Sequence, residues 1–587
     1  MNSKKSIQFL YIIKKSVQSS IKTSKVSTTL GVFSPHNIQF GLLILGITFL
    51  SFSSSSSFST KNLSEGRTYY LNGLTGSDVN DGLSPQSAWQ SLQKASQVDL
   101  RPGDKILLSK GCTFYGKLQM NGGGSESDPV IVSAYDPKSG NTSLPVINAK
   151  GYLAAIQIEN GKNIKISNLE LTSDAGTPEE PQACTERYGV LITASEPGIY
   201  PNLKLEKLRI HNIFATENIE SNGQNLTSNM GMGIVITMQN KDAIIKNVRV
   251  EDCAIEMTGH TGIRIFGWGD KSDTTWLDNV TIVNNRLTHI GGPGMVPGRC
   301  QHVLVRGNMV DHSGSSIDPR MHARGSGIWP WTCNNVLIEK NKLMHARGKN
   351  DSCGAHIDFN CKNVVVQYNL SLDNEGGFVE ILGNNHNCAY RYNISINDGF
   401  RVKGENGAQN DGKILWTSGY VGHGNKRTGP FNSYIYNNTI FVKEGSRSCF
   451  SFEKTTEGLL IANNIFHVLG KTLHVQGGQE IFENELSQSI PNVVFTNNLY
   501  INAAVLPADL PVKDINPYIG NPEFKNGGGD DPHNYVPENS KLIKDKGIRI
   551  EKIPGDKIGL TIGLGVELDY FGHSINGLPD LGAIEIQ

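Results

Sequence analysis

The sequence predicts an all-β fold, a parallel β-helix in which the chain winds through stacked coils. One observation is a recurring pattern of two apolar residues separated by one position, with asparagine three positions later, as in Val280, Ile282 and Asn285. It returns at intervals of about 20 to 35 residues, which is typical of solenoid repeats. The other is the high content of glycine, 64 residues, which favours many turns between short strands. Further copies of the pattern end in Asn308, Asn341, Asn369, Asn464 and Asn498.

A secretory signal region is expected in residues 1–57. Several lysines precede an apolar run from Gly41 to Leu50, and a serine-rich tract follows it. The run is too short for a comfortable membrane span and has the length of the apolar part of a secretory signal. We therefore expect a secreted or periplasmic protein, with a membrane anchor as the alternative.

Residues 66–111 are expected to cap the first coil, because an open coil end is an exposed sheet edge. The segment Asp78 to Gly82 resembles a small calcium loop, but the distal glutamate is missing, which favours an ordinary turn. The segment Ser87 to Ala95 predicts one short helix with Trp89 and Leu92 on its buried face.

The repeats define residues 112–505 as the β-helix domain and residues 506–587 as a C-terminal cap and extended tail. The asparagine after each strand is expected to fill a turn and to bond to asparagines of adjacent coils. Cys300, Cys333 and Cys361 each stand at the same place before a pattern asparagine. They predict a column of buried thiols, with a disulfide between adjacent coils as the alternative.

Charge and cysteine content limit the possible functions. The net charge is −1 and only 19% of residues are charged, which argues against a nucleic-acid binder. The 9 cysteines include no CxxC pair, so they do not indicate a zinc site. We expect no cofactor, apart from possible calcium, and a monomer without a membrane span in its mature form.

Candidate catalytic carboxylates lie on a second set of short strands that begin with glycine. In GAHIDF and GGFVEI, Asp358 and Glu380 follow Gly354 and Gly376 at the same distance, which predicts that they align on one face. Aligned positions on adjacent strands lie ~4.8 Å apart, close to the ~5–5.5 Å between the two carboxyl groups of retaining glycosidases. Arg264 and Trp329 are expected on the same face.

A wider pair remains open. Asp358 with Asp373 or Glu375 would fit the ~6.5–9.5 Å that an inverting enzyme needs. The sequence therefore predicts Asp358, Glu380 and Asp373 as catalytic residues. The residues expected to bind the substrate, because aromatic rings stack on sugars and charged groups bind polar ones, are Arg264, His322, Trp329, Trp331, His356 and Glu375. A metal held by His322, His356 and Asp358 is the alternative, although their spacing is not compact.

Three stretches carry a resemblance to the secreted right-handed parallel β-helix enzymes of bacterial polysaccharide breakdown. They are YYLNGLTGSDVNDGLSPQSAWQSL, HIDFNCKNVVVQYNLSLDNEGGF and LPDLGAIEIQ, and the resemblance covers about residues 66 to 587. The central stretch is similar to glycoside hydrolases of the family that includes α-L-fucosidases and xylanases. This resemblance implies Asp358 and Asp373 as the acids that match the family motif, whereas His356 stands where related sequences often carry a second acid.

The first functional hypothesis is a secreted glycoside hydrolase that acts on a plant or algal cell-wall polysaccharide or oligosaccharide. The second is a polysaccharide lyase, which would use a base such as His322, His356 or Lys403 to abstract a proton next to a uronate carboxyl group. The third is a non-catalytic solenoid that binds carbohydrate.

Overall fold

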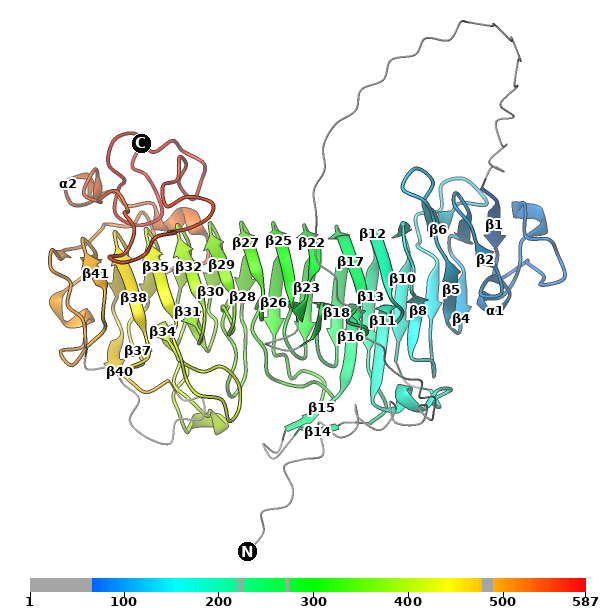
Figure 1. Ribbon diagram of the computed structural model, residues 1–587, viewed down its shortest axis with the longest axis horizontal. Coiled ribbons are helices and arrows are strands. Elements are labelled where there is room, and N and C mark those ends of the chain that lie inside the picture. The colour runs from blue at the N-terminus through cyan, green and yellow to red at the C-terminus, as the bar shows by residue number, and fades with distance from the viewer. Residues whose placement is uncertain (1–65, 175, 218, 222–225, 270–273, 478–488) are drawn as a thin grey trace, which may run out of the picture. The chain divides into compact units, whose positions relative to one another are not determined.

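The computed structural model describes residues 66–587 except 175, 218, 222–225, 270–273 and 478–488. The signal region expected in residues 1–57 therefore lies outside the described residues. Three long faces of parallel strands stack coil upon coil, from β1 at one end to β41 at the other (Figure 1). Among the described residues no helix is long and apolar enough to cross a membrane. The fold is the expected parallel β-helix.

The first sheet has 14 strands. They are β1 (Thr68–Leu71), β3 (Lys105–Ser109), β6 (Val130–Tyr135), β9 (Ile164–Ser167), β12 (Gly198–Glu206), β17 (Ala243–Glu251), β22 (Leu277–Val283), β25 (Cys300–Arg306), β27 (Asn334–Glu339), β29 (Lys362–Gln367), β32 (His386–Arg391), β35 (Phe431–Tyr436), β38 (Glu457–Ala462) and β41 (Val493–Thr496). The apolar pattern residues are in register, with Val280 beside Val303 and Val303 beside Val336.

The second sheet also has 14 strands. They are β4 (Thr113–Tyr115), β7 (Val146–Asn148), β10 (Glu170–Ser173), β13 (Arg209–Ile213), β18 (Ala254–Thr258), β23 (Arg286–Ile290), β26 (Met309–Ser313), β28 (Lys342–Met344), β30 (Leu370–Leu372), β33 (Ile394–Ile396), β36 (Thr439–Val442), β39 (Ile465–Val468), β42 (Leu499–Tyr500) and β43 (Tyr518–Ile519).

The third face consists of two sheets joined by single bridges. Its first part is β2 (Asp99–Leu100), β5 (Leu118–Gly122), β8 (Ala154–Glu159), β11 (Glu186–Ala194), β16 (Met230–Met238), β19 (Ile263–Phe266) and β24 (Met295–Gly298). Its second part is β31 (Gly377–Ile381), β34 (Lys413–Thr417), β37 (Arg447–Phe452) and β40 (Lys471–His474). Between them, Ile328 bridges Met295 and Ala355, and Ile357 bridges Ile381, so one continuous face results.

A buried ladder of asparagines runs between the first and second sheets. The side-chain amide of Asn285 donates to Oδ1 of Asn308 at 3.0 Å, and the step repeats coil by coil. The ladder ends on the carboxylate of Asp514, which accepts from Asn498 at 2.9 Å. Because every rung satisfies an amide inside the core, the ladder stabilises the stacking that the sequence pattern predicts. Its intermediate members are Asn308, Asn341, Asn369, Asn393, Asn438, Asn464 and Asn498.

The core is apolar and includes thiols that are not cross-linked. Cys300, Cys333 and Cys361 are buried and free. The backbone N–H of Cys333 lies 3.4 Å from the Cys361 sulfur, so the thiols stack in adjacent coils. The expected column of buried thiols is confirmed, and the alternative of a disulfide is not formed.

The N-terminal segment differs from the expected single helix over Ser87 to Ala95. A 3-10 turn covers Pro85–Ser87 and α1 covers Leu92–Ala95. Between them Trp89 pairs with β1 through its backbone, so that the chain is extended where a helix was expected. Trp89 and Leu92 are nevertheless buried as predicted.

The calcium-like segment forms turns in which the carboxylates accept local hydrogen bonds. Asp78 accepts from the backbone of Gln90 and Ser91, and Asp81 accepts from Leu83. These local hydrogen bonds are those expected of an Asx-rich turn.

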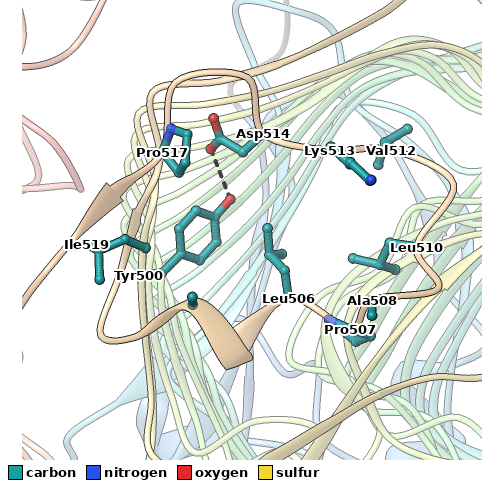
Figure 2. Close-up of a pocket in the computed structure, with 11 residues that line it drawn as sticks. Tyr500, Leu506, Pro507, Ala508, Leu510, Val512, Lys513, Asp514, Pro517 and Ile519 are labelled. Atoms are coloured by element: carbon teal, nitrogen blue, oxygen red, sulfur yellow. Dashed lines mark hydrogen bonds between the residues drawn. The ribbon is translucent and has the colours of Figure 1, made fainter.

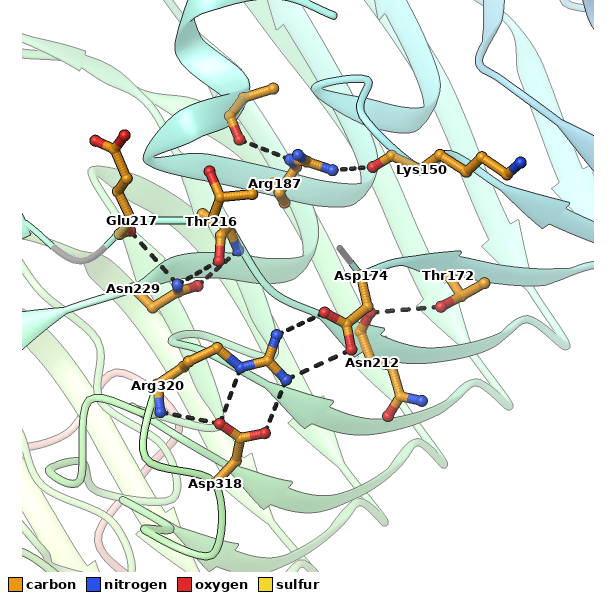
Figure 3. A network of polar contacts seen from close by, with 12 residues as sticks. Lys150, Thr172, Asp174, Arg187, Asn212, Thr216, Glu217, Asn229, Asp318 and Arg320 are labelled. Atoms are coloured by element: carbon orange, nitrogen blue, oxygen red, sulfur yellow. Dashed lines mark hydrogen bonds and ion pairs between the residues drawn. The ribbon is translucent and has the colours of Figure 1, made fainter. Parts of the chain in front are cut away.

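A loop at 314–325 folds back over earlier coils (Figure 3). Arg320 binds Asp174 at 2.6 Å and Asp318 at 2.8 Å, and its guanidinium lies 3.9 Å from the ring centre of Phe214. These contacts join segments far apart in sequence and fix the loop. The position of this loop matters because Arg324 lies at its end.

The C-terminal segment packs on the outside of the last coils and contains the short helix α2 (Ser540–Ile543). Asp556 accepts from the side-chain amide of Asn387, and Ile553 and Leu560 pack with Tyr434 and Tyr392.

Candidate active site

The outer side of the third face carries two columns of side chains that point away from the core. The first column contains, coil by coil, Arg264, Val296, Trp329, His356 and Glu380. The second column contains Phe266, Gly298, Trp331 and Asp358. Most candidates from the sequence therefore share one face, as expected from their positions after glycine.

The expected alignment of Asp358 with Glu380 is wrong by two residues. Ile357 pairs with Ile381, so Asp358 lies opposite Leu382 and Glu380 lies opposite His356. The asparagine ladder explains the difference, because it joins Asn369 directly to Asn393 and so sets a longer coil than the glycines suggest. Asp358 and Glu380 are diagonal neighbours, with Cβ atoms about 8 Å apart from strand geometry.

Asp358 is a partly exposed carboxyl group that holds a proton near neutral pH. Burial raises its pKa to about 7, and the negative charges of Asp351 and Glu380 act in the same direction. Its Oδ1 accepts one hydrogen bond, from the backbone N–H of Phe359 at 2.8 Å. A carboxylic acid in this state is suited to donate a proton.

Asp351 is the opposite case. Burial acts to raise its pKa, but the charge of Arg324 and the hydrogen bonds that Arg324 donates help to outweigh burial, and the pKa is lowered. The Nε and Nη2 atoms of Arg324 both donate to Oδ2 of Asp351, at 2.9 and 2.6 Å. The Asp351 side chain is 26% exposed, so this carboxylate remains ionised and within reach of solvent. Two interacting carboxyl groups with pKa values moved in opposite directions are a recognised acid and base arrangement.

Aromatic rings lie beside Asp358 on the same face. The ring of Trp329 stacks on the ring of His356, with their centres 5.5 Å apart. Nδ1 of His356 forms a hydrogen bond with Ser326 Oγ at 2.9 Å. Trp331 contacts Phe359 at 5.7 Å, and its Nε1 has no hydrogen-bond partner among the described residues. Such rings provide flat apolar surfaces of the kind that stack on sugar rings.

Glu380 lies below this surface. It is 2% exposed and accepts from the Cys353 thiol at 3.1 Å. The buried Lys413 lies close to it, and burial lowers the pKa of Lys413 to about 8 while the charge of Glu380 opposes that shift. Glu380 cannot touch a bound ligand without rearrangement, so its catalytic role stays a prediction.

Asp373 and Glu375 lie at the other end of the strand. Asp358 aligns with Leu382, just after β31, whereas Asp373 and Glu375 precede β31, so a strand length of ~16 Å separates them. Asp373 forms an ion pair with Arg347 at 2.5 Å. The same register places the backbone of Asp351 level with Glu375, because Cys353 pairs with Gly377, so strand position alone does not choose between them. The pairing of Asp358 with Asp373 or Glu375 stays a prediction.

His322 and Arg264 lie towards the N-terminal side of the site. His322 stacks on His260 at 4.7 Å, and the charges of Arg264 and Arg324 both act on His260. Among the described residues, the potential ligand atoms of His322, His356 and Asp358 do not form a compact cluster.

A cavity of ≈220 Å³ lies elsewhere, beyond the last coils (Figure 2). Its wall includes Leu506, Leu510 and Tyr500. The Asp514 carboxylate in this wall accepts a hydrogen bond from the Tyr500 hydroxyl at 3.0 Å. In the second sheet β42 lies four strands from β30, which places the cavity about 20 Å from the level of Asp373. It contains no pair of free acids, so the chemistry points to the third face instead.

Asp351 and Arg324 are the residues that the sequence analysis missed as a functional pair. Asp351 precedes the GAHIDF strand, but no pattern marks it. Only the loop at 314–325, which returns across several coils, brings Arg324 to it.

No protein-family model matches the sequence. In an alignment of 627 positions, the chain is 23% identical to a lacto-N-biosidase of Bifidobacterium longum subsp. longum. The alignment covers 89% of this chain and 36% of that protein. The chain thus spans about a third of the length of this curated relative.

Solved structures give a similar result. The GH136 lacto-N-biosidase from Eubacterium ramulus matches with a TM-score of 0.50 and 21% identity, over 75% of this chain and 68% of that chain. The complex of XylC with xylose has a TM-score of 0.48 and 12% identity, over 89% and 98%. The first likeness supports the fold. The relatives agree with the coarser resemblance, to β-helix glycoside hydrolases, and not with the family of α-L-fucosidases and xylanases.

Proposed function

We propose that the protein is a glycoside hydrolase in which Asp358 and Asp351 are the two catalytic carboxyl groups. The observation that carries this proposal is that Asp358, beside Trp331 on the third face, and Asp351, held by two hydrogen bonds from Arg324, influence each other's charge, with pKa values that move in opposite directions. The similarity to the lacto-N-biosidase of Bifidobacterium longum supports the same class of reaction.

Asp358 is the general acid in this proposal. With a pKa of about 7 it is protonated at mildly acidic pH and can donate to the glycosidic oxygen as the bond breaks. The proton leaves on the departing sugar.

Asp351 supplies the second carboxylate. It is ionised, and Arg324 holds it in place. It acts on the anomeric carbon directly in a retaining reaction, or activates a water molecule in an inverting one, and the anomer released first distinguishes the two.

The other acids fit these roles less well. Glu380 is 2% exposed, and its charge raises the pKa of Asp358, so it tunes the acid from below the surface. Asp373 is paired with Arg347 at 2.5 Å, and Glu375 accepts a hydrogen bond from the backbone N–H of Gly348 at 2.9 Å. Trp329 and Trp331 are proposed to stack on the sugar rings.

The substrate remains part of the proposal. The plant or algal cell-wall polysaccharide expected from the sequence receives no support from the relatives, both named lacto-N-biosidases. Oligosaccharides that contain lacto-N-biose are therefore the first substrates to try, before cell-wall polysaccharides.

The experiment compares wild type with Asp358→Asn on both groups of substrates. We expect new reducing ends without new ultraviolet absorbance, and a loss in kcat of roughly 10³-fold or more in the variant. The wild-type rate should fall as pH rises through about 7, because Asp358 then loses its proton. Ultraviolet-absorbing products would indicate the lyase instead, and full activity of Asp358→Asn would exclude this site.

A further inference from the structure

A column of histidines lies at the edge of the second sheet. His289, His312 and His345 occupy equivalent positions in successive coils, since Thr288 pairs with Asp311 and Asp311 with Met344. Their rings follow one another at 4.8 Å in both steps. The column belongs to the coils that carry Trp329 and Asp358, but it lies on a different sheet.

Three potential ligand atoms converge in this column. Oδ1 of Asp311 lies 2.7 Å from Nδ1 of His312 and 2.7 Å from Nδ1 of His345. The three groups have ligand atoms within 4.8 Å of one another. Nδ1 of His289, the next ring in the stack, is buried and has no hydrogen-bond partner in the described part of the chain.

We propose that Asp311, His312 and His345 bind a divalent transition metal, with Zn²⁺ the best match, and that His289 is the fourth ligand. Imidazole nitrogen and carboxylate oxygen bind zinc at ~2.0–2.2 Å. Calcium and magnesium prefer oxygen ligands, so a site with three imidazoles disfavours them. The buried Nδ1 of His289 gains the partner that it otherwise lacks.

The surrounding charges permit a cation. Arg347 is the nearby positive group, but it forms an ion pair with Asp373 at 2.5 Å. Asp373 follows His345 in the same column, so the positive charge of Arg347 is neutralised beside the site. A bound metal would tie β23, β26 and β28 together, three successive coils. The site is independent of the proposed hydrolase activity.

The column itself suggests substitutions that preserve the turn. All three histidines have left-handed backbone, with φ of 51°, 61° and 55°. Asn212 and Asn397 hold the same positions in other coils with φ of 52° and 54°. Asparagine tolerates this conformation, so His312→Asn with His345→Asn removes both ligands and keeps the backbone. Asp311→Asn is a second variant of nearly unchanged shape.

His302 offers a matched control. It is also left-handed, with φ of 53°, and its Nδ1 lies 2.7 Å from Asp278 Oδ1. Among the described residues, no second histidine joins His302 and Asp278 in a compact group of potential metal ligands. His302→Asn should therefore leave metal binding unchanged.

The test is isothermal titration of the full chain with ZnCl₂ after removal of metals by a chelator. We expect one zinc per chain, a loss in affinity of more than about tenfold in both variants at the column, and no loss in His302→Asn. Co²⁺ should produce a visible absorption band in wild type and not in His312→Asn with His345→Asn. Absence of stoichiometric uptake, equal uptake by the column variants, or an equal loss in His302→Asn would overturn the proposal.

Discussion

Asp358 and Asp373 belong to the same central segment, yet their surroundings are opposite. Asp358 lies on the outer side of the third face, where burial raises its pKa to about 7. Asp373 lies at the edge of the second sheet, where Arg347 neutralises it at 2.5 Å. The comparison teaches that an acid in this fold becomes reactive through what the adjacent coils place beside it, rather than through the strand that carries it.

The same comparison applies to two ion pairs of arginine and aspartate, one near Asp358 and one that includes Asp373. Arg324 binds Asp351 beside Asp358, and Arg347 binds Asp373 beside the histidine column. The two ion pairs have similar geometry, with N–O distances of 2.6 and 2.5 Å. Only the first lies next to a protonated carboxyl group, so changes at the two pairs should have different effects on catalysis.

The largest effect is expected from the aspartates of the two ion pairs. Asp351→Asn should reduce kcat by roughly 10³-fold or more, because it removes the ionised partner of Asp358. Asp373→Asn should change kcat by less than about threefold, because Arg347 pairs with this carboxylate at the edge of the second sheet. Rates on a substrate that wild type cleaves measure both, and an equal loss in the two variants would contradict the assignment.

A smaller effect is expected from the arginines. Arg324→Met should raise the pKa of Asp351, which moves the acidic limb of the pH–rate profile to higher pH and lowers kcat by about 10- to 100-fold. Arg347→Met, the matched control, should leave both limbs in place. An acidic limb that does not move in Arg324→Met would show that Asp351 does not control it.

The smallest effect concerns stability. The pKa of Asp358 is raised from its ordinary value of 3.8 to about 7 in the folded chain. The protonated form is therefore favoured in the fold, and wild type loses stability as pH rises from about 4 through about 7. Asp358→Asn should melt at a higher temperature than wild type at about pH 8 and at the same temperature at about pH 4. Calorimetry at both pH values measures this, and Asp373→Asn, whose carboxylate is paired, should show no such gain.

Much of the fold could be predicted from local patterns. The apolar residues with a following asparagine, such as Val280, Ile282 and Asn285, indicate both the coil and the ladder. These signals can be read from the sequence because the pattern recurs in successive coils of the β-helix. The single helix predicted over Ser87 to Ala95 is wrong, because Trp89 pairs with β1, a contact that local propensity does not contain.

The candidate site was predictable in part. Arg264, Trp329, His356 and Glu380 do share a column, as alternation along the strands implies. The alignment of Asp358 was missed because a coil length that differs by two residues changes which side chains are neighbours. Arg324 was missed as a partner because a loop that crosses several coils brings it to Asp351.

The sequence by itself determined that this chain forms a stacked β solenoid with an asparagine ladder and that its acids gather in the central coils. Only the tertiary structure decided which acids meet, which of them holds a proton and which is paired with arginine. The physical reason is that the repeat is a local property, whereas a pKa depends on burial and on charges brought together by coil length and returning loops.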